Sequence, residues 1–141
     1  MSGTDRAVEL FEQACAARGR GRYDEAAALF LQSIEVRPTA EAHTFLGWTY
    51  ASMGRYDAAI AECHKATSVD PEFGNPYNDI GAYLIELGRP DEAVPWLQRA
   101  NRAARYEAPP MDEGRKDALA AYVAKRKEEI KAGKLLPDVL D

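Results

Sequence analysis

Histidine and cysteine, which often bind metals or act in catalysis, are rare in this 141-residue sequence. The chain has two histidines, His43 and His64, and two cysteines, Cys15 and Cys63. Cys63 and His64 are adjacent, and neighbouring residues on a helix point in different directions, so this pair does not chelate one metal ion. The sequence contains no HExxH, CxxC, GxSxG or phosphate-binding loop. We therefore expect a protein that is not an enzyme and that carries no cofactor.

The same residues have a simpler interpretation as structural side chains. His43 falls on a predicted packing face, and Cys63 stands where a small apolar side chain is buried. Two cysteines do not make a disulfide framework and favour free thiols in a reducing compartment. The start of the chain, MSGTDRAVELFEQA, lacks a positive region followed by an apolar one. These features predict a cytoplasmic protein.

The charge of the chain argues against two classes of partner. The formal net charge is −5, and the basic triplet at residues 125–127 is followed at once by two glutamates. Binding to nucleic acid needs a basic face, so a nucleic-acid partner is not expected. No apolar run approaches the roughly 20 residues that span a bilayer, so a membrane partner is not expected either.

Three similar segments organise the chain. They are GRYDEAAALFLQS from Gly21, GRYDAAIAECHKA from Gly54 and GRPDEAVPWLQRA from Gly88, spaced 33 and 34 residues apart. The glycine that opens each segment lies between two helix-length stretches, which predicts helices at about 5–18, 22–36, 40–53, 56–69, 74–87 and 90–103. Glycine suits the positive φ at a helix C-terminus, and Pro38 and Pro71 follow the first two units, where a helix cannot continue.

This pattern resembles the tetratricopeptide repeat family over about residues 7–107. The second unit carries the family's signature at Leu46, Gly47, Tyr50, Gly54, Tyr56, Ala59, Ala66 and Pro71. The third matches at Tyr77, Ile80, Gly81, Leu84, Gly88, Ala93, Leu97 and Ala100, and the first at Ala14, Gly21, Tyr23, Ala26, Phe30 and Pro38. The small residues among them are expected where paired helices approach closely.

The resemblance implies an all-α, right-handed α-solenoid of three helix-turn-helix repeats plus a C-terminal capping helix. We expect a repeat domain at residues 1–107, with repeats at about 7–39, 40–73 and 74–107, and a capping helix and tail at 108–141. The last helix is predicted at about 112–132, with Leu119, Tyr122 and Val123 packed against the helix near 90–103.

Function is then expected in a surface. The resemblance implies that the first helix of each pair lines a concave groove, where the candidate partner-binding residues are Phe11, Cys15, Thr44, Phe45, Trp48, Asn75, Asn78, Asp79 and Glu86. Phe11, Phe45 and Trp48 make an aromatic cluster beside an acidic and amide-rich wall. Exposed aromatic residues with a polar rim are typical of interaction sites. The pattern predicts a protein or peptide partner with apolar anchors and some basic residues.

Chaperone-binding members of the family hold a peptide C-terminal carboxylate with Lys, Asn and Arg at fixed groove positions. The matching positions here are Phe11, Cys15, Phe45, Asn75 and Asp79, of which only Asn75 can donate a hydrogen bond, so a carboxylate-clamp client is not expected. We predict a non-catalytic adaptor or scaffold. The alternatives are a self-associating structural scaffold (a homo-oligomer), a small secretion-type chaperone, and a purely internal packing role for the aromatic cluster.

Overall fold

The computed structural model describes residues 3–106, together with residues 124, 125 and 128. Within residues 3–106 the chain folds into six helices. They are α1 (Gly3–Gly19), α2 (Tyr23–Val36), α3 (Ala40–Ser52), α4 (Tyr56–Val69), α5 (Asn75–Glu86) and α6 (Pro90–Asn101). Each end lies within two residues of its predicted position, so the helices expected over this part of the chain are confirmed.

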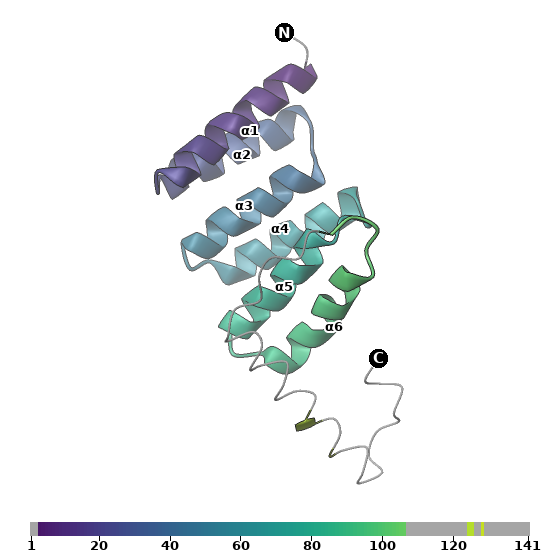
Figure 1. Cartoon of the computed structure of the whole chain (residues 1–141). Coiled ribbons are helices and arrows are strands. Elements are labelled where there is room, and N and C mark those ends of the chain that lie inside the picture. The colour runs from purple at the N-terminus through teal and green to yellow at the C-terminus, as the bar shows by residue number, and fades with distance from the viewer. Residues whose placement is uncertain (1–2, 107–123, 126–127, 129–141) are drawn as a thin grey trace.

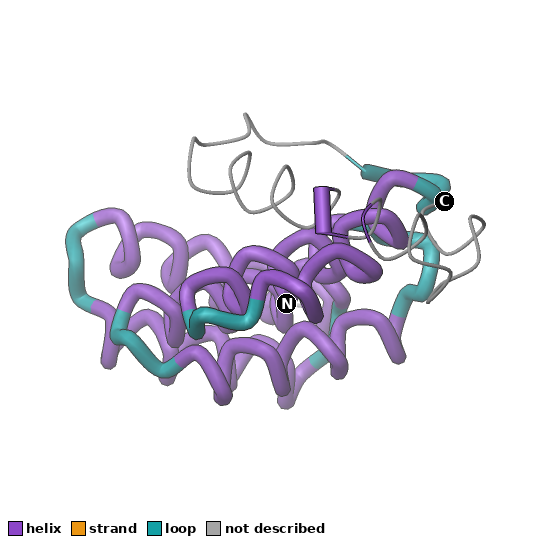
Figure 2. Tube along the Cα trace, turned by 90° about the horizontal axis from the view of Figure 1, so that it is seen from below, coloured by secondary structure: helices purple, strands orange, loops and turns teal. Residues whose placement is uncertain are grey.

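The helices form antiparallel pairs that stack one after another, as Figure 1 shows. Helix α1 packs on α2, α3 on α4 and α5 on α6, while α2 contacts α3 and α4 contacts α5. The helices α1, α3 and α5 also touch their neighbours in series, so they form one layer of the stack, which we call the inner layer, and α2, α4 and α6 form the other (Figure 2). This is an all-α solenoid of three helix pairs.

The turn inside each pair has one conformation, used three times. Gly21, Gly54 and Gly88 have φ values of 75°, 75° and 76°, a region that favours glycine. The residue after each glycine is an arginine, whose backbone N–H bonds to a carbonyl five residues back at 2.9, 2.9 and 2.8 Å. This bond closes the end of the first helix in the Schellman arrangement. The repeated Gly-Arg dipeptide thus fixes the same hairpin in each unit.

Small residues allow the paired helices to approach closely. Ala26, Ala59 and Ala93 are fully buried in the three seams. A Cβ added to Gly47 would lie 3.2 Å from the carbonyl oxygen of Ala59, which shows how near the backbones of α3 and α4 come. Larger side chains fill the space on either side, notably the fully buried Phe30.

The chain after α6 turns back along the connection between α4 and α5. Phe73 and Arg105 form an isolated parallel bridge, in which the N–H of Gly74 donates to the carbonyl of Arg105 at 2.7 Å and the N–H of Arg105 donates to the carbonyl of Glu72 at 3.0 Å. The guanidinium of Arg105 also contacts Asp70 and lies 5.0 Å from the ring centroid of Phe73. The predicted capping helix, including Leu119, Tyr122 and Val123, lies outside the described residues except at three positions.

Candidate interaction surface

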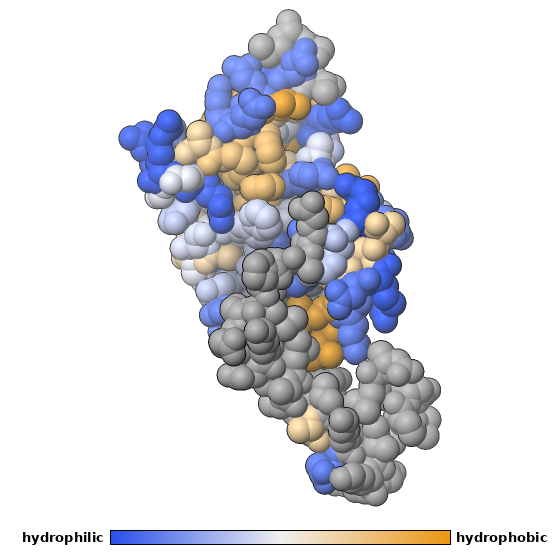
Figure 3. All heavy atoms as spheres, in the orientation of Figure 1, coloured by the Kyte–Doolittle hydropathy of each residue, from blue (hydrophilic) through white to orange (hydrophobic). Residues whose placement is uncertain are grey.

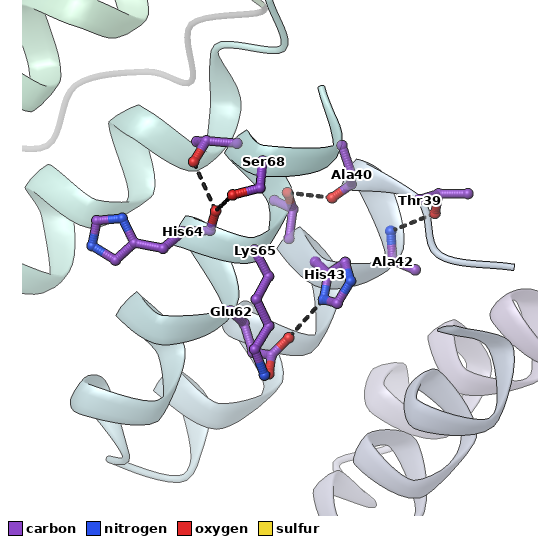
Figure 4. A network of polar contacts seen from close by, with 10 residues as sticks. Thr39, Ala40, Ala42, His43, Glu62, His64, Lys65 and Ser68 are labelled. Atoms are coloured by element: carbon purple, nitrogen blue, oxygen red, sulfur yellow. Dashed lines mark hydrogen bonds and ion pairs between the residues drawn. The ribbon is translucent and has the colours of Figure 1, made fainter. Parts of the chain in front are cut away.

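The titratable side chains nearest to a catalytic arrangement lie inside the second repeat. His43 Nδ1 and Glu62 Oε2 are 2.8 Å apart across the seam between α3 and α4, and Lys65 Nζ donates to the other carboxylate oxygen at 3.1 Å (Figure 4). His43 and Glu62 are both buried. Burial alone would raise the pKa of Glu62, but the hydrogen bonds from His43 and Lys65 together lower the pKa below its usual value. The pair is placed to hold α3 and α4 together, with side chains that are only 10% and 7% exposed.

The thiols offer no reactive centre in the described part of the chain. Cys63 is fully buried, and burial raises the pKa of its thiol well above the usual value. Cys15 is half-buried, and burial raises the pKa of this thiol as well, against the opposing effect of Arg18. A raised pKa leaves little thiolate, which is the nucleophilic form. Among the described residues, no three His, Cys, Asp or Glu side chains are grouped so as to hold a metal ion.

The three aromatic residues named from the sequence lie in one row across α1 and α3. The ring centroids of Phe11 and Phe45 are 5.1 Å apart at an interplanar angle of 80°, and those of Phe45 and Trp48 are 4.5 Å apart. Phe11 also meets the buried Phe30 edge-on, with centroids 5.6 Å apart. All three side chains of the row are half-buried. One side of the row therefore belongs to the core, while the other remains open.

Polar contacts extend this row toward α5. The indole Nε1 of Trp48 donates to Oδ2 of Asp79, and the guanidinium carbon of Arg18 lies 5.7 Å from the centroid of the Trp48 ring. Arg18, Trp48 and Asp79 come from α1, α3 and α5, so one connected set of side chains crosses the whole inner layer. The Arg18–Trp48 contact has the geometry of a cation–π interaction.

The other residues named from the sequence differ in how far they reach the surface. Cys15 and Asn75 are half-buried and Glu86 is exposed. Thr44, Asn78 and Asp79 are buried, and the hydroxyl of Thr44 donates to the carbonyl of Ala40 at 2.7 Å. These three residues therefore contribute to the floor beneath the surface rather than to the surface itself.

Three polar atoms of α1 and α5 are buried without a hydrogen-bond partner among the described residues. They are Arg18 Nε, Asn75 Oδ1 and the hydroxyl of Tyr83. Burial raises the pKa of Tyr83, and the nearby carboxylate of Asp79 raises it further. The Tyr83 hydroxyl therefore keeps its proton and remains a hydrogen-bond donor.

Sequence comparison supports the same architecture. The profile of the tetratricopeptide repeat matches residues 11–76 and 53–108, which together cover more than half of the chain. This chain belongs to the tetratricopeptide repeat family.

Individual relatives of this tetratricopeptide repeat protein are longer. It is 30% identical over 100 residues to small glutamine-rich tetratricopeptide repeat-containing protein 2 of Mycosarcoma maydis, covering 70% of this chain and 27% of that protein. It is 31% identical over 110 residues to the Hsp70-Hsp90 organizing protein of Triticum aestivum, covering 74% and 17%. The crystal structure of MamA superimposes with a TM-score of 0.66 at 29% identity, over 70% of this chain and 58% of MamA. The chain thus spans about a quarter or less of these two curated relatives.

A pocket that the sequence does not single out opens at the edge of the first repeat. It is an open pocket with a cavity volume of about 180 Å³, and it is lined by Ala7, Val8, Phe11, Ser33, Arg37, Thr39 and Glu41. We call it the edge pocket. Its walls come from α1, from the end of α2 and from the start of α3. Reasoning from the first helices alone does not find it, because the second helix and the connection after it supply Ser33, Arg37 and Thr39.

Proposed function

We propose that this protein is a non-catalytic adaptor or scaffold that binds a segment of a partner protein on its inner layer. The observation that carries this proposal is the row Phe11–Phe45–Trp48, whose rings touch one another while each stays half-buried. Aromatic side chains that are fixed by neighbours and open on one side are typical hot spots of protein interfaces. In the space-filling view, apolar side chains gather over α1, in the upper part of the molecule (Figure 3).

The charges around this row favour a partner with apolar anchors and some Lys or Arg. Glu12 and Glu86 are exposed on α1 and α5, and the buried Asp79 adds negative charge beneath them. The net charge of −5 also attracts basic segments, and it argues against nucleic acid as the partner because it repels phosphate groups. Family membership supports a protein partner, since the name of the wheat relative describes a protein that organizes Hsp70 and Hsp90.

A carboxylate clamp does not form part of the proposal. Of the five matching positions, Phe11, Phe45 and Cys15 offer no cation, and Asp79 repels an anion. Asn75 is the one position that can donate to a carboxylate, through its Nδ2, and a single amide donor does not make a clamp. The partner is therefore expected to contribute an internal segment or a basic one, rather than an acidic C-terminus.

We extend the proposal to domain limits and location. Residues 1–107 are proposed as the repeat domain and 108–141 as its cap and tail. The free thiols of Cys15 and Cys63 suit a reducing cytoplasm. Among the helices that the structure describes, none has the length and apolar character needed to cross a membrane.

Site-specific photo-crosslinking tests the proposed surface. Benzoylphenylalanine is introduced in place of Phe45, on the aromatic row, or in place of Leu31, an exposed residue of α2 that serves as the matched control. After irradiation in a lysate of the native cell, we expect a crosslinked partner from position 45 and none from position 31. A crosslinked dimer of this chain from position 45 would support the self-associating scaffold instead. Crosslinks from position 31 alone would move the site to the layer formed by α2, α4 and α6.

A further inference from the structure

We propose that the edge pocket is a binding subsite for an aliphatic or aromatic side chain of a partner segment, with a Lys or Arg next to it that pairs with Glu41. The proposal rests on the proposed function, because it names the part of the partner that one end of the surface would hold. The edge pocket shares Phe11 with the aromatic row, so the two form one continuous surface.

The interior of the edge pocket is apolar because its polar side chains are already engaged. The hydroxyl of Ser33 donates to the carbonyl of Ala7 at 2.7 Å, and the hydroxyl oxygen of Thr39 accepts the N–H of Ala42 at 3.0 Å. Apart from the charged Arg37 and Glu41, what remains toward the cavity are the side chains of Ala7, Val8 and Phe11. An apolar side chain that enters loses its hydration without leaving a buried polar group unpaired.

Val8 marks the open side of the edge pocket. This side chain is 50% exposed, the largest exposure among the big apolar side chains of the described residues. It lies one turn before Phe11 on α1, so the two residues stand on the same side of that helix. A single exposed valine needs no explanation on a protein surface, but a valine at the mouth of a cavity of about 180 Å³ adds contact area for one side chain of an occupant.

Glu41 gives the subsite its charge preference. Its side chain is 46% exposed and its carboxylate is held by a long contact of 3.7 Å to Arg105. The guanidinium of Arg105 has a closer ion pair with Asp70 and also lies over the ring of Phe73. A basic group from a partner can therefore reach Glu41 without displacing Arg105 from those contacts. The position of Arg105 also shows that this carboxylate accepts a guanidinium from an extended segment alongside it.

Arg37 is the other charged residue of the edge pocket, and it already takes part in an interaction. The preference for a basic group is therefore assigned to Glu41, whose side chain is 46% exposed. The acidic charge of the whole chain adds a long-range attraction for basic segments. The shortest partner sequence that fits both the apolar cavity and the Glu41 carboxylate is thus a leucine or phenylalanine next to a lysine or arginine.

Three capped peptides probe the subsite: GSGLKGSG, GSGLEGSG and GSGGKGSG, each acetylated and amidated so that no terminal carboxylate is present. Each is titrated to millimolar concentration into the full ¹⁵N-labelled chain and followed by heteronuclear NMR. We expect the Leu-Lys peptide to shift the amides of the residues that line the edge pocket. The Leu-Glu peptide should bind about three- to tenfold more weakly, the range given by one exposed ion pair replaced by a repulsion. The Gly-Lys peptide should lose the shifts near Val8.

Two variants and two controls make the result specific. Glu41→Gln should abolish the preference for Leu-Lys over Leu-Glu, and Val8→Ala should weaken both leucine peptides. Glu35→Gln and Leu31→Ala change exposed residues of α2 that do not line the cavity, and they should bind as the wild type does.

Equal affinity for the Leu-Lys and Leu-Glu peptides, a preference that survives Glu41→Gln, or shifts that avoid the edge pocket would each overturn the proposal. Absence of any shift at millimolar peptide would do so as well. The proposed function is judged separately, because crosslinking through position 45 depends on the native partner and not on these peptides. If a partner crosslinks at position 45 and no peptide binds in the edge pocket, the adaptor role is supported and this subsite is rejected.

Discussion

The indole Nε1 of Trp48 donates a hydrogen bond to Oδ2 of Asp79, and this bond joins the first helix of the second repeat to the first helix of the third. Asp79 is buried, whereas Trp48 is half-buried. Trp48 therefore presents part of its ring to the inner surface while its N–H holds a neighbouring repeat. A substitution at either residue acts on stability as well as on binding.

We predict that Trp48→Ala destabilises the fold, because the indole holds the buried carboxylate of Asp79 on the next repeat. Removing a hydrogen-bond donor from a buried carboxylate costs about 1–3 kcal/mol. Asp79→Asn keeps a carbonyl acceptor for the indole, so it should lose less stability than Asp79→Ala. Urea unfolding followed by circular dichroism gives the three midpoints. Equal losses for the two Asp79 variants would show that the bond contributes nothing.

The positions of the helices and turns could be predicted because local chemistry determines them. Glycine at Gly21, Gly54 and Gly88 is required by a positive φ, and the apolar spacing between these turns sets the helix lengths. The accessibility of inner-layer residues could not be predicted in the same way. Thr44 and Asp79 were expected at the surface and are buried, because the depth of a side chain depends on how each pair rotates against the next.

The edge pocket and the return of the chain after α6 could not be predicted from the sequence either. Both depend on connections between repeats, where Ser33, Thr39 and Arg105 meet residues far away in the chain. No periodic pattern marks such contacts. The partner-binding role of the aromatic row stays a prediction, although the contacts among Phe11, Phe45 and Trp48 are those expected of a cluster.

We predict that Gly74→Ala destabilises the protein more than Gly47→Ala does. A Cβ at Gly74 would lie 2.7 Å from Tyr106 Cβ and 2.9 Å from the carbonyl oxygen of Ala100, so the chain after α6 would have to move. The φ of −80° at Gly74 is allowed for alanine, so the cost is one of packing, about 1–3 kcal/mol. At Gly47 the tightest contact is 3.2 Å, and the helix propensity of alanine, worth about 1 kcal/mol, offsets it. Thermal unfolding ranks the two variants, and the opposite order would contradict the close approach at Gly74.

Ala59→Leu should destabilise the second repeat. Ala59 is fully buried in the seam between α3 and α4, and its carbonyl faces Gly47 at close range. A leucine there overpacks the seam at a cost of about 1–3 kcal/mol. The matched control is Ala61→Leu, an exposed position on the same helix, where the change should stay within about 0.5 kcal/mol. An unchanged urea midpoint for Ala59→Leu would argue against the seam as described.

The His43–Glu62 pair predicts how the folding stability depends on pH. The hydrogen bonds from His43 and Lys65 outweigh burial and hold the pKa of Glu62 below its usual value, as the contacts in Figure 4 illustrate. Because the folded pKa is below the unfolded one, the carboxylate stabilises the fold above the unfolded pKa. That contribution is lost as the pH falls through the folded pKa.

Glu62→Gln should therefore be less stable than the wild type at pH 7. This difference in stability between the two proteins should narrow as the pH falls from about 5 to about 3. Urea midpoints of both proteins measured across this range provide the check. A stability difference between the two proteins that stays constant across this pH range would mean that glutamine only disturbs packing. The ionised carboxylate would then not stabilise the seam.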